Sequence, residues 1–387
     1  MRSTQPVRQH SGGLKDLEDN DPLQVRLDDL EKHLGDNDDG PRFIQHNLVS
    51  DGFVKPDHID PNLINPWGIS HSATSPFWIS DAGSGVTTIY NAASVAVAVG
   101  GQTTPLVIPG HTAVTIAAAP GQIGPSHPTG QVFNTGAPGF TITEGGKTAS
   151  SAFIFATTNG TISGWAPSVD RASSVLAVDH SAAGAEYTGL TMLNGPTGTL
   201  LYAADFHGGK IEVFNSAFTR VNSFTDTSLP HGYAPFNVQA LGGNVFVTFA
   251  LRDPAGKFDV PGAHHGFVDE FDAQGHLIQR IASRGPLDSP WGLAIAPASF
   301  GKLAGDLLVG NFGDGTIDAF NLTTDKFDGK LLGGNDKPLV IEALWGLIPG
   351  NGGDANTIYF TAGGPNAVHG LFGSLAPAPV IPDIDRM

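Results

Sequence analysis

The chain has 387 residues, of which only 15% are charged, and its formal net charge is −17. It contains no cysteine, which excludes disulfides, thiolate catalysis and cysteine-ligated zinc. Its lysines and arginines do not cluster, so we expect no nucleic-acid partner. No apolar run has the length of a membrane span, and the first residues lack the apolar core of a signal peptide.

Residues 1–40 differ in composition from everything that follows. Acidic residues are dense between Asp16 and Asp39, and four leucines recur at the spacings of one helix face: Leu23, Leu27, Leu30 and Leu34. A short isolated helix of this kind is marginal in water. We therefore expect an acidic, mostly disordered leader with a possible short helix, and a docking or dimer-forming helix is the alternative.

Residues 42–50 have the apolar character of a strand and stand ahead of an internal repeat. Three copies of one motif mark this repeat: Asn65-Pro-Trp-Gly68, Ser289-Pro-Trp-Gly292 and Leu344-Trp-Gly346. Each repeat unit consists of two apolar runs joined by a Gly-rich turn. Six such units follow one another at about the forty to fifty residues of a propeller blade: 77–91, 152–165, 200–215, 244–271, 307–321 and 357–373.

Burial requirements favour a closed ring of these units. The first run of each unit is apolar on both faces, as a strand between neighbouring sheets must be. The second run alternates, with Ile211 and Val213 set against Lys210 and Glu212, as a strand nearer solvent does. Sheets stacked around an axis satisfy both patterns without capping repeats. The sequence therefore predicts an all-β, six-bladed β-propeller over residues 41–377.

The last unit lacks an outer strand after Leu375. We predict that residues 42–50 supply this strand and so join the two ends of the ring. Residues 378–387 form an extended, Pro-rich tail in this reading.

The string of motifs resembles that of an uncharacterised family of mostly secreted bacterial and fungal proteins, which is similar to NHL-type six-bladed propellers. The motifs that carry the resemblance are Asn65-Pro-Trp-Gly, Asp205-Phe-His207-Gly, Ala234-Pro-Phe-Asn237, Ser289-Pro-Trp-Gly, Gly310-Asn-Phe-Gly-Asp-Gly315 and Leu344-Trp-Gly. The resemblance implies the propeller fold and a secreted or periplasmic location, and it supplies no catalytic residue. Calcium-dependent lactonases are more distant propellers, and their Glu and Asn/Asp set at the mouth has no residue-by-residue match here.

Turns from separate blades should converge on one central mouth of a propeller. We expect polar and aromatic residues of these turns and of the repeated motif to lie there: Asn65, Trp67, Asp81, Asn159, Asp205, His207, Asn237, His264, His265, Trp291, Asn311, Asp314, Trp345 and His369.

Three of these histidines come from different blades and could share one metal ion. Neutral imidazoles are the usual ligands of zinc and other transition metals, so His207, His265 and His369 predict a divalent metal site with an open position. Asp205 would be a further ligand, or an acceptor that fixes an imidazole tautomer. The long insertion 252–265 is expected to be a functional loop over the mouth. A calcium ion held by carboxylates of Asp81, Asp205 and Asp314 is the alternative.

Structural roles compete with each of these interpretations. Asp and Asn in Gly-containing turns bond their own backbone and need no further function. The tryptophans of the repeated motif could simply pack between blades. Because His264 and His265 are adjacent, at most one of them should face inward.

These observations lead to two functional hypotheses. The first is a metal-dependent hydrolase, lyase or isomerase acting on a small polar molecule at the mouth, with Asp205 and Asn237 as catalytic residues. The second is a non-catalytic scaffold that binds a peptide, glycan or protein partner, with or without a structural calcium. Under either hypothesis we expect a monomer.

Overall fold

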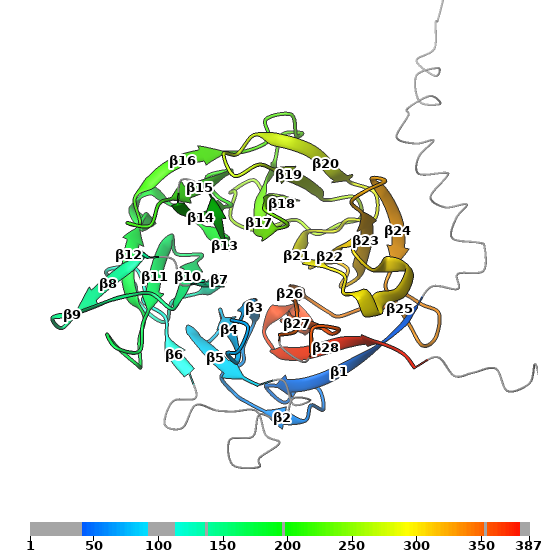
Figure 1. Ribbon diagram of the computed structural model, residues 1–387, viewed down its shortest axis with the longest axis horizontal. Coiled ribbons are helices and arrows are strands. Elements are labelled where there is room, and N and C mark those ends of the chain that lie inside the picture. Colours follow the sequence, from blue (N-terminus) through cyan, green and yellow to red (C-terminus); the bar gives the residue numbers. More distant parts are fainter. Residues whose placement is uncertain (1–40, 92–112, 136–137, 196–197, 352–353, 380–387) are drawn as a thin grey trace, which may run out of the picture. The chain divides into compact units, whose positions relative to one another are not determined.

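The computed structural model describes residues 41–91, 113–135, 138–195, 198–351 and 354–379. The predicted leader and its helix, and the tail from residue 380, lie outside the described residues. The described chain forms six antiparallel sheets arranged as blades around one axis, which confirms the predicted six-bladed propeller (Figure 1).

Each blade is a meander, and in blades 1 to 5 the strands run in chain order from the axis outward. Blade 1 contains β3 (Pro66–Ser70), β4 (Phe77–Asp81), β5 (Val86–Tyr90) and β6 (Ala113–Thr115). Blade 2 contains β7 (Pro128–Phe133), β10 (Phe153–Thr157), β11 (Thr161–Trp165) and β12 (Val175–Asp179). Blade 3 contains β13 (Tyr187–Gly195), β14 (Gly198–Asp205), β15 (Lys210–Phe214) and β16 (Arg220–Phe224).

The second half of the ring repeats this order. Blade 4 contains β17 (Tyr233–Leu241), β18 (Asn244–Leu251), β19 (Phe267–Phe271) and β20 (Leu277–Ser283). Blade 5 contains β21 (Pro290–Ile295), β22 (Leu307–Asn311), β23 (Ile317–Asn321) and β24 (Lys326–Lys330). Blade 6 contains β26 (Leu344–Pro349), β27 (Ile358–Ala362), β28 (Leu371–Pro377) and, as its fourth strand, β1 (Arg42–Ser50).

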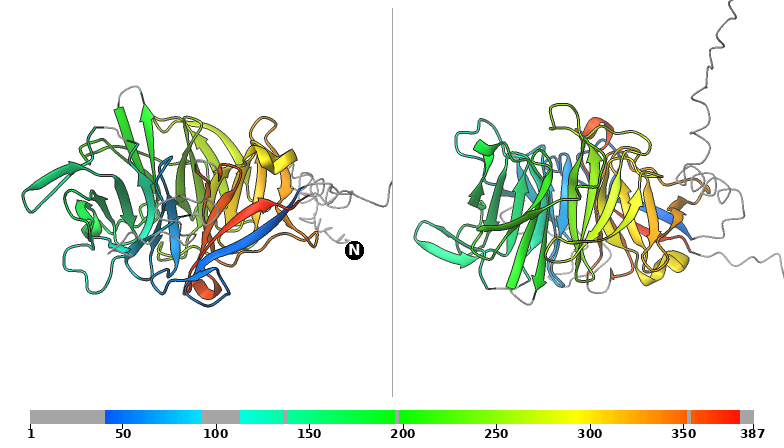
Figure 2. Two further views of the ribbon diagram at one scale, coloured as in Figure 1. Left: turned by 60° about the horizontal axis from the view of Figure 1, so that its bottom comes forward. Right: turned by 90° about the horizontal axis from the view of Figure 1, so that it is seen from above.

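The remaining elements are short. Strands β8 (Thr141–Glu144) and β9 (Lys147–Ser150) form a hairpin that projects beside blade 2, as the side views of Figure 2 show. Strands β2 (His58–Ile59) and β25 (Leu332–Gly333) pair in parallel with the two ends of β1. The described chain also contains short 3-10 segments at Ser181–Ala183, Ala298–Leu303 and Pro365–Ala367. No described helix is long and apolar enough to cross a membrane.

The two ends of the described chain meet in blade 6. Strand β1 pairs antiparallel with β28, from Phe43 opposite Pro377 to Ser50 opposite Leu371, with one irregularity near Asn47. Figure 1 shows the blue first strand lying along the red last one. This pairing confirms that residues 42–50 complete the last blade, and it leaves the ring without an open end.

The innermost strands form a second, tighter ring. Strands β3, β7, β13, β17, β21 and β26 each contact the next in this order, and β26 contacts β3. Glycine is required for this approach: a Cβ on Gly68 would lie 2.4 Å from the carbonyl oxygen of Thr129 in the next blade, and a Cβ on Gly130 would lie 2.1 Å from the backbone nitrogen of Leu190. The glycine of the repeated motif therefore sets the distance between these blades.

The third strands are more deeply buried than the sequence predicts. Glu212 in β15 is only 2% exposed, although its alternation with Ile211 indicates a solvent-facing position. The reason is that the fourth strand, β16, covers it and supplies Arg220, whose guanidinium pairs with its carboxylate. Charged residues thus replace solvent as the neighbours of this face.

Candidate functional site

The axis of the ring is filled by aromatic side chains near the face at which the inner strands begin, here called the mouth face. Trp67 stacks on Trp345 with ring centroids 3.5 Å apart, and Trp291 meets both rings edge-on at 6.1 and 5.8 Å. Phe236 packs against Trp67 from the opposite side of the ring. These side chains come from blades 1, 4, 5 and 6, so they contact one another across the axis as well as between neighbouring blades.

Two turns on the mouth face extend this aromatic cluster. Phe312 follows β22 and stacks on Trp345 at 4.1 Å, and Phe206 follows β14 and packs on Phe236 at 5.0 Å. Trp67 and Phe312 stay half-buried, whereas the other members are buried. The cluster is therefore a closed floor with two partly accessible aromatic rings.

Six residues surround this floor, one from each blade, and they occupy equivalent positions at the start of the inner strands, directly before the repeated motif. The three from blades 4, 5 and 6 are buried: Ala234, Ser289 and Ala343. The three from blades 1, 2 and 3 are accessible: Asn65, His127 and Glu186. Accessible polar groups of the ring thus gather on one half of the mouth.

Glu186 is the ionisable carboxyl of this ring. Its backbone is fixed because Phe206 N–H donates to its carbonyl and its own N–H donates to Asp205 Oδ1 at 3.1 Å. Its side chain is half-buried and receives no hydrogen bond from any described residue. Burial raises the pKa of Glu186 to about 7; Lys257 opposes this shift, and Asp205 and Asp253 add to it.

The insertion 252–265 is tied to the turn beside Glu186. Arg252 Nη1 donates to the carbonyls of Phe206 and His207, at 3.1 and 2.8 Å, and His207 Nδ1 lies 3.1 Å from the carbonyl oxygen of Gly256. These bonds hold the insertion at the mouth face next to blade 3, and they place Lys257 within the electrostatic range of Glu186.

The three predicted metal-binding histidines do not come together. His207 bonds to Gly256, His265 Nδ1 lies 2.8 Å from the carbonyl oxygen of Val260, and His369 Nδ1 lies 2.9 Å from Asp51 Oδ2. Each imidazole is therefore engaged at a different blade junction. Within the described ranges, no three His, Asp or Glu side chains are arranged to hold a metal ion.

The three-imidazole centre therefore stays a prediction, and the carboxylates of the alternative calcium site are likewise engaged with neighbouring groups. Asp81 is fully buried and accepts a hydrogen bond from Thr88 N–H at 3.0 Å, Asp205 caps its own turn, and Asp314 bonds to Thr316. Topology brings these turns to the same face, and within the described chain each of the three carboxylates accepts a backbone N–H of its own blade.

The two predicted catalytic residues make structural bonds. Asp205 is 3% exposed, and its Oδ1 accepts from the N–H groups of Glu186 and Gly208. Asn237 stands where the other five blades have glycine, and its Nδ2 donates to the carbonyl of Trp291 at 2.7 Å. A catalytic role for Asp205 or Asn237 remains a prediction, and the observed contacts of both side chains hold neighbouring strands together.

The other predicted mouth residues divide by exposure. Asn65 accepts a hydrogen bond from Trp345 Nε1 at 3.0 Å, and Asn159 accepts one from His127 N–H at 3.2 Å, so both lie at the mouth. His264 and Asp314 are exposed on turns of blades 4 and 5, and Trp67 is half-buried in the floor. Four predicted mouth residues are instead buried: Asp81, Trp291, Asn311 and Trp345.

Sequence reasoning missed Glu186 and His127 because their blades carry weak copies of the repeated motif. Pro128-Thr-Gly130 and Tyr187-Thr-Gly189 occupy the place of Pro66-Trp-Gly68, but threonine stands where the other copies have an aromatic residue. Both weak copies keep the glycine at the third position of the motif, and this glycine is the signal that could have identified them. Aligning the six copies on it puts Glu186 and His127 at the position of Asn65.

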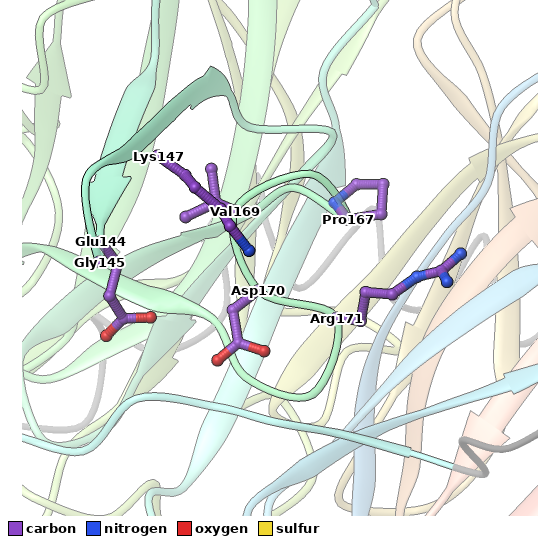
Figure 3. A pocket seen from close by; sticks show the side chains of 7 residues that line it. All are labelled: Glu144, Gly145, Lys147, Pro167, Val169, Asp170 and Arg171. Atoms are coloured by element: carbon purple, nitrogen blue, oxygen red, sulfur yellow. The ribbon is translucent and has the colours of Figure 1, made fainter.

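A separate hollow of about 390 Å³ lies at the outer edge of blade 2, between the β8–β9 hairpin and the loop after β11 (Figure 3). It is lined by Glu144, Gly145, Lys147, Pro167, Val169, Asp170 and Arg171. Two acidic and two basic side chains balance one another there, and most of the lining is exposed. We therefore place the candidate site at the mouth, where a half-buried carboxyl stands beside aromatic rings.

Comparison with known proteins identifies relatives. No family model matches the chain. Two uncharacterized proteins of Acanthamoeba polyphaga mimivirus are 33% and 32% identical to it, over 344 and 345 residues. The matches cover 86% of this chain in both cases, and 80% and 86% of the two relatives.

Solved structures with a similar course of the chain are propellers of several kinds. A streptogramin B lyase is 11% identical with a TM-score of 0.46, and the matched region covers 88% of this chain and 98% of the lyase. The soluble aldose sugar dehydrogenase of Escherichia coli is 11% identical with a TM-score of 0.49, covering 87% of this chain and all of the enzyme. A sequence identity of 11% says nothing about the function of this chain. The two viral relatives, in contrast, are similar to it in sequence over most of their length. The chain belongs to the same protein family as these two mimivirus proteins.

Proposed function

We propose that this propeller is an enzyme that acts on a small polar molecule at its mouth, with Glu186 as the group that donates or accepts a proton. The observation that carries the proposal is the setting of Glu186: a half-buried carboxyl at the edge of an aromatic floor, with no hydrogen bond from a described residue. A carboxyl whose pKa is about 7 is present in both protonation states near neutral pH. Hydrolases, lyases and isomerases all use such a group.

The surroundings of Glu186 would orient a ligand. Trp67 and Phe312 are partly exposed aromatic side chains that a sugar or another ring could contact. Lys257 supplies a positive charge, and the imidazole of His207 lies on the neighbouring turn. Proton transfer by Glu186 requires no set of metal ligands.

Replacement of Glu186 by glutamine tests this proposal. Turnover of a panel of monosaccharides, sugar lactones and hydroxy acids would be followed by NMR, and we expect any activity found to fall by about 10²- to 10⁴-fold in Glu186→Gln. Glu342→Gln is the matched control, because Glu342 is an exposed carboxyl on a mouth-face loop of blade 6. Wild-type turnover by Glu186→Gln would refute the assignment.

A second measurement needs no substrate. Titration of ¹³C-labelled glutamate carboxyls, with Glu186→Gln used for assignment, should find one carboxyl that titrates near pH 7. A Glu186 carboxyl that titrates at the ordinary value of 4.5 would remove the basis of the proposed acid-base role.

Exposed apolar side chains favour a second candidate function, a non-catalytic scaffold for a peptide, glycan or protein. Phe258 in the insertion, Val340 before blade 6 and Val368 within it are 71%, 62% and 58% exposed, and all three lie on mouth-face loops. Such side chains are typical of contact surfaces when several share one face. Phe258→Ser would weaken binding to such a partner, whereas it would leave turnover at Glu186 unchanged.

A further inference from the structure

Blades 3, 4 and 5 share a buried ion pair whose carboxylate lies on the third strand and whose cation lies on the fourth. The pairs are Glu212 with Arg220, Asp269 with Arg280, and Asp318 with Lys330. All three carboxylates are at most 2% exposed. Blade 5 differs because the cation on its fourth strand is a primary amine, which can act as a nucleophile once it is deprotonated, whereas a guanidinium stays charged.

The carboxylate of Asp318 bridges this amine and a buried carboxamide. Lys330 Nζ lies 2.9 Å from Asp318 Oδ1, and Asn311 Nδ2 donates to Asp318 Oδ2 at 2.8 Å. The hydroxyl oxygen of Thr316 lies 2.7 Å from Lys330 Nζ and 3.2 Å from Asn311 Nδ2. Both nitrogens therefore contact the Asp318 carboxylate and the Thr316 hydroxyl, which places them close to each other.

The carboxamide of Asn311 is held in one orientation. Asp288 N–H donates to its Oδ1 at 3.0 Å, so the carbonyl oxygen faces a backbone donor and Nδ2 faces the carboxylate. Asn311 and Asp318 are both fully buried. A backbone N–H on a carbonyl oxygen stabilises the negative charge that develops there during nucleophilic attack.

We propose that blade 5 joins Lys330 to Asn311 through an intramolecular amide bond that forms without any external reagent. Asp318 takes a proton from the ammonium, and the neutral Nζ attacks Cγ of Asn311. The Cγ–Nδ2 bond then breaks, and Asp318 passes the protons of the attacking nitrogen to the departing one. The ammonium and the carboxamide become one secondary amide and one ammonium ion, so atoms and charge balance.

The state of Asp318 suits this proton transfer. Burial raises the pKa of Asp318 to about 6, although Lys330 and Asn311 act in the opposite direction. Asp318 Oδ1 faces Lys330 Nζ at 2.9 Å, so this oxygen is placed to accept the proton of the amine. A proton can therefore rest on this carboxyl between the two transfers.

The other two blades serve as internal comparisons. In blade 3 the residue equivalent to Asn311 is Asp205, whose Oδ1 bonds to the backbone of Glu186 and Gly208 instead of to Glu212. In blade 4 the cation over Asp269 is Arg280. Among these three blades, the combination of amine, carboxamide and bridging carboxylate occurs in blade 5.

The mass of the intact wild-type chain tests the proposal directly. We expect a mass below that of the sequence by one ammonia, and digestion should give one branched peptide that contains both Asn311 and Lys330. Localisation to that branched peptide separates this reaction from loss of ammonia at Asn-Gly pairs such as Asn159-Gly160. An unmodified mass, or separate Asn311 and Lys330 peptides from folded protein, would overturn the proposal.

Three variants identify the roles of the residues. Lys330→Arg keeps the charge but cannot react, so it should show the full mass of its sequence, and Asp318→Asn should do the same because proton transfer is lost. Asn311→Asp should release water in place of ammonia. Lys210→Arg is the matched control, since Lys210 also pairs with a buried carboxylate, Glu212, and it should leave the loss of ammonia intact. Ammonia loss that persists in Lys330→Arg would contradict the assignment.

Discussion

Neighbouring hydrogen-bond donors decide how each buried carboxylate of this propeller behaves. Burial alone would raise the pKa of Glu212, but hydrogen bonds from Tyr187, Arg220 and Lys210 outweigh it and lower the pKa to about 2. Glu186 lacks such donors among the described residues, and its pKa rises. The same residue type thus stabilises the fold in one place and is available for chemistry in another.

Glu212→Gln should destabilise the protein by about 3 kcal/mol at pH 7, because it leaves two cations without their buried partner. The folded-state pKa of Glu212 lies below its ordinary value of 4.5, so its stabilising contribution is present above pH 4.5 and is lost as the pH falls toward 2. Thermal unfolding should therefore show a gap between wild type and variant that is wide at pH 7 and narrow at pH 3.

Glu144→Gln is the control for this comparison, since Glu144 is exposed on the β8–β9 hairpin. A Glu212→Gln variant as stable as the wild type at pH 7 would contradict the proposed balance of burial and hydrogen bonding.

Residue types alone could not predict the candidate site. The sequence shows that histidines and carboxylates occur in turns on one face, but it does not show which backbone groups compete for them. His265 and Asp205 are occupied by local carbonyl and N–H groups, whereas Glu186 follows a turn with no donor for its side chain. The difference arises from folded geometry that no spacing encodes.

At the scale of elements, apolar pattern and turn chemistry predicted the second and third strands of all six blades. The fourth strands were harder because they are exposed and carry no clear alternation, as in β16, where four of five residues are exposed. The innermost strands of blades 2 and 3 were missed because threonine replaces the aromatic residue of the motif. Strand β1 was predictable because the sequence of blade 6 lacked a fourth strand, and residues 42–50 are an apolar segment outside the repeats that can supply one.

Removal of β1 should therefore cost far more stability than removal of the segment before it. A chain that begins at Asp51 loses Phe43 and Val49, each 1% exposed, whose burial contributes about 1.5–3 kcal/mol apiece. It also leaves β28 as an unpaired edge. We expect a large fall in the unfolding temperature relative to a chain that begins at Pro41, measured by circular dichroism. Equal unfolding temperatures for the two truncated chains would show that β1 does not close the ring.

At the scale of the whole molecule, closure depends on how near the inner strands approach one another. The aromatic floor contains side chains from blades 1, 3, 4, 5 and 6, which can meet near the axis because backbone packs directly against backbone at the glycines of the inner ring. A side chain at one of these glycines would push two blades apart, and a closed ring has no free end at which to relieve the displacement.

Gly130→Ala measures this constraint. The added Cβ would lie 2.1 Å from the backbone nitrogen of Leu190, so β7 and β13 must separate, and we expect a loss of about 3 kcal/mol in the free energy of unfolding. Gly334→Ala is the matched control, because a Cβ there meets nothing within 4 Å and the residue lies outside the inner ring. Urea denaturation should show the loss for Gly130→Ala alone. Similar midpoints for the two variants would mean that the blades can move apart without cost, and the aromatic floor would then need another explanation for its tight packing.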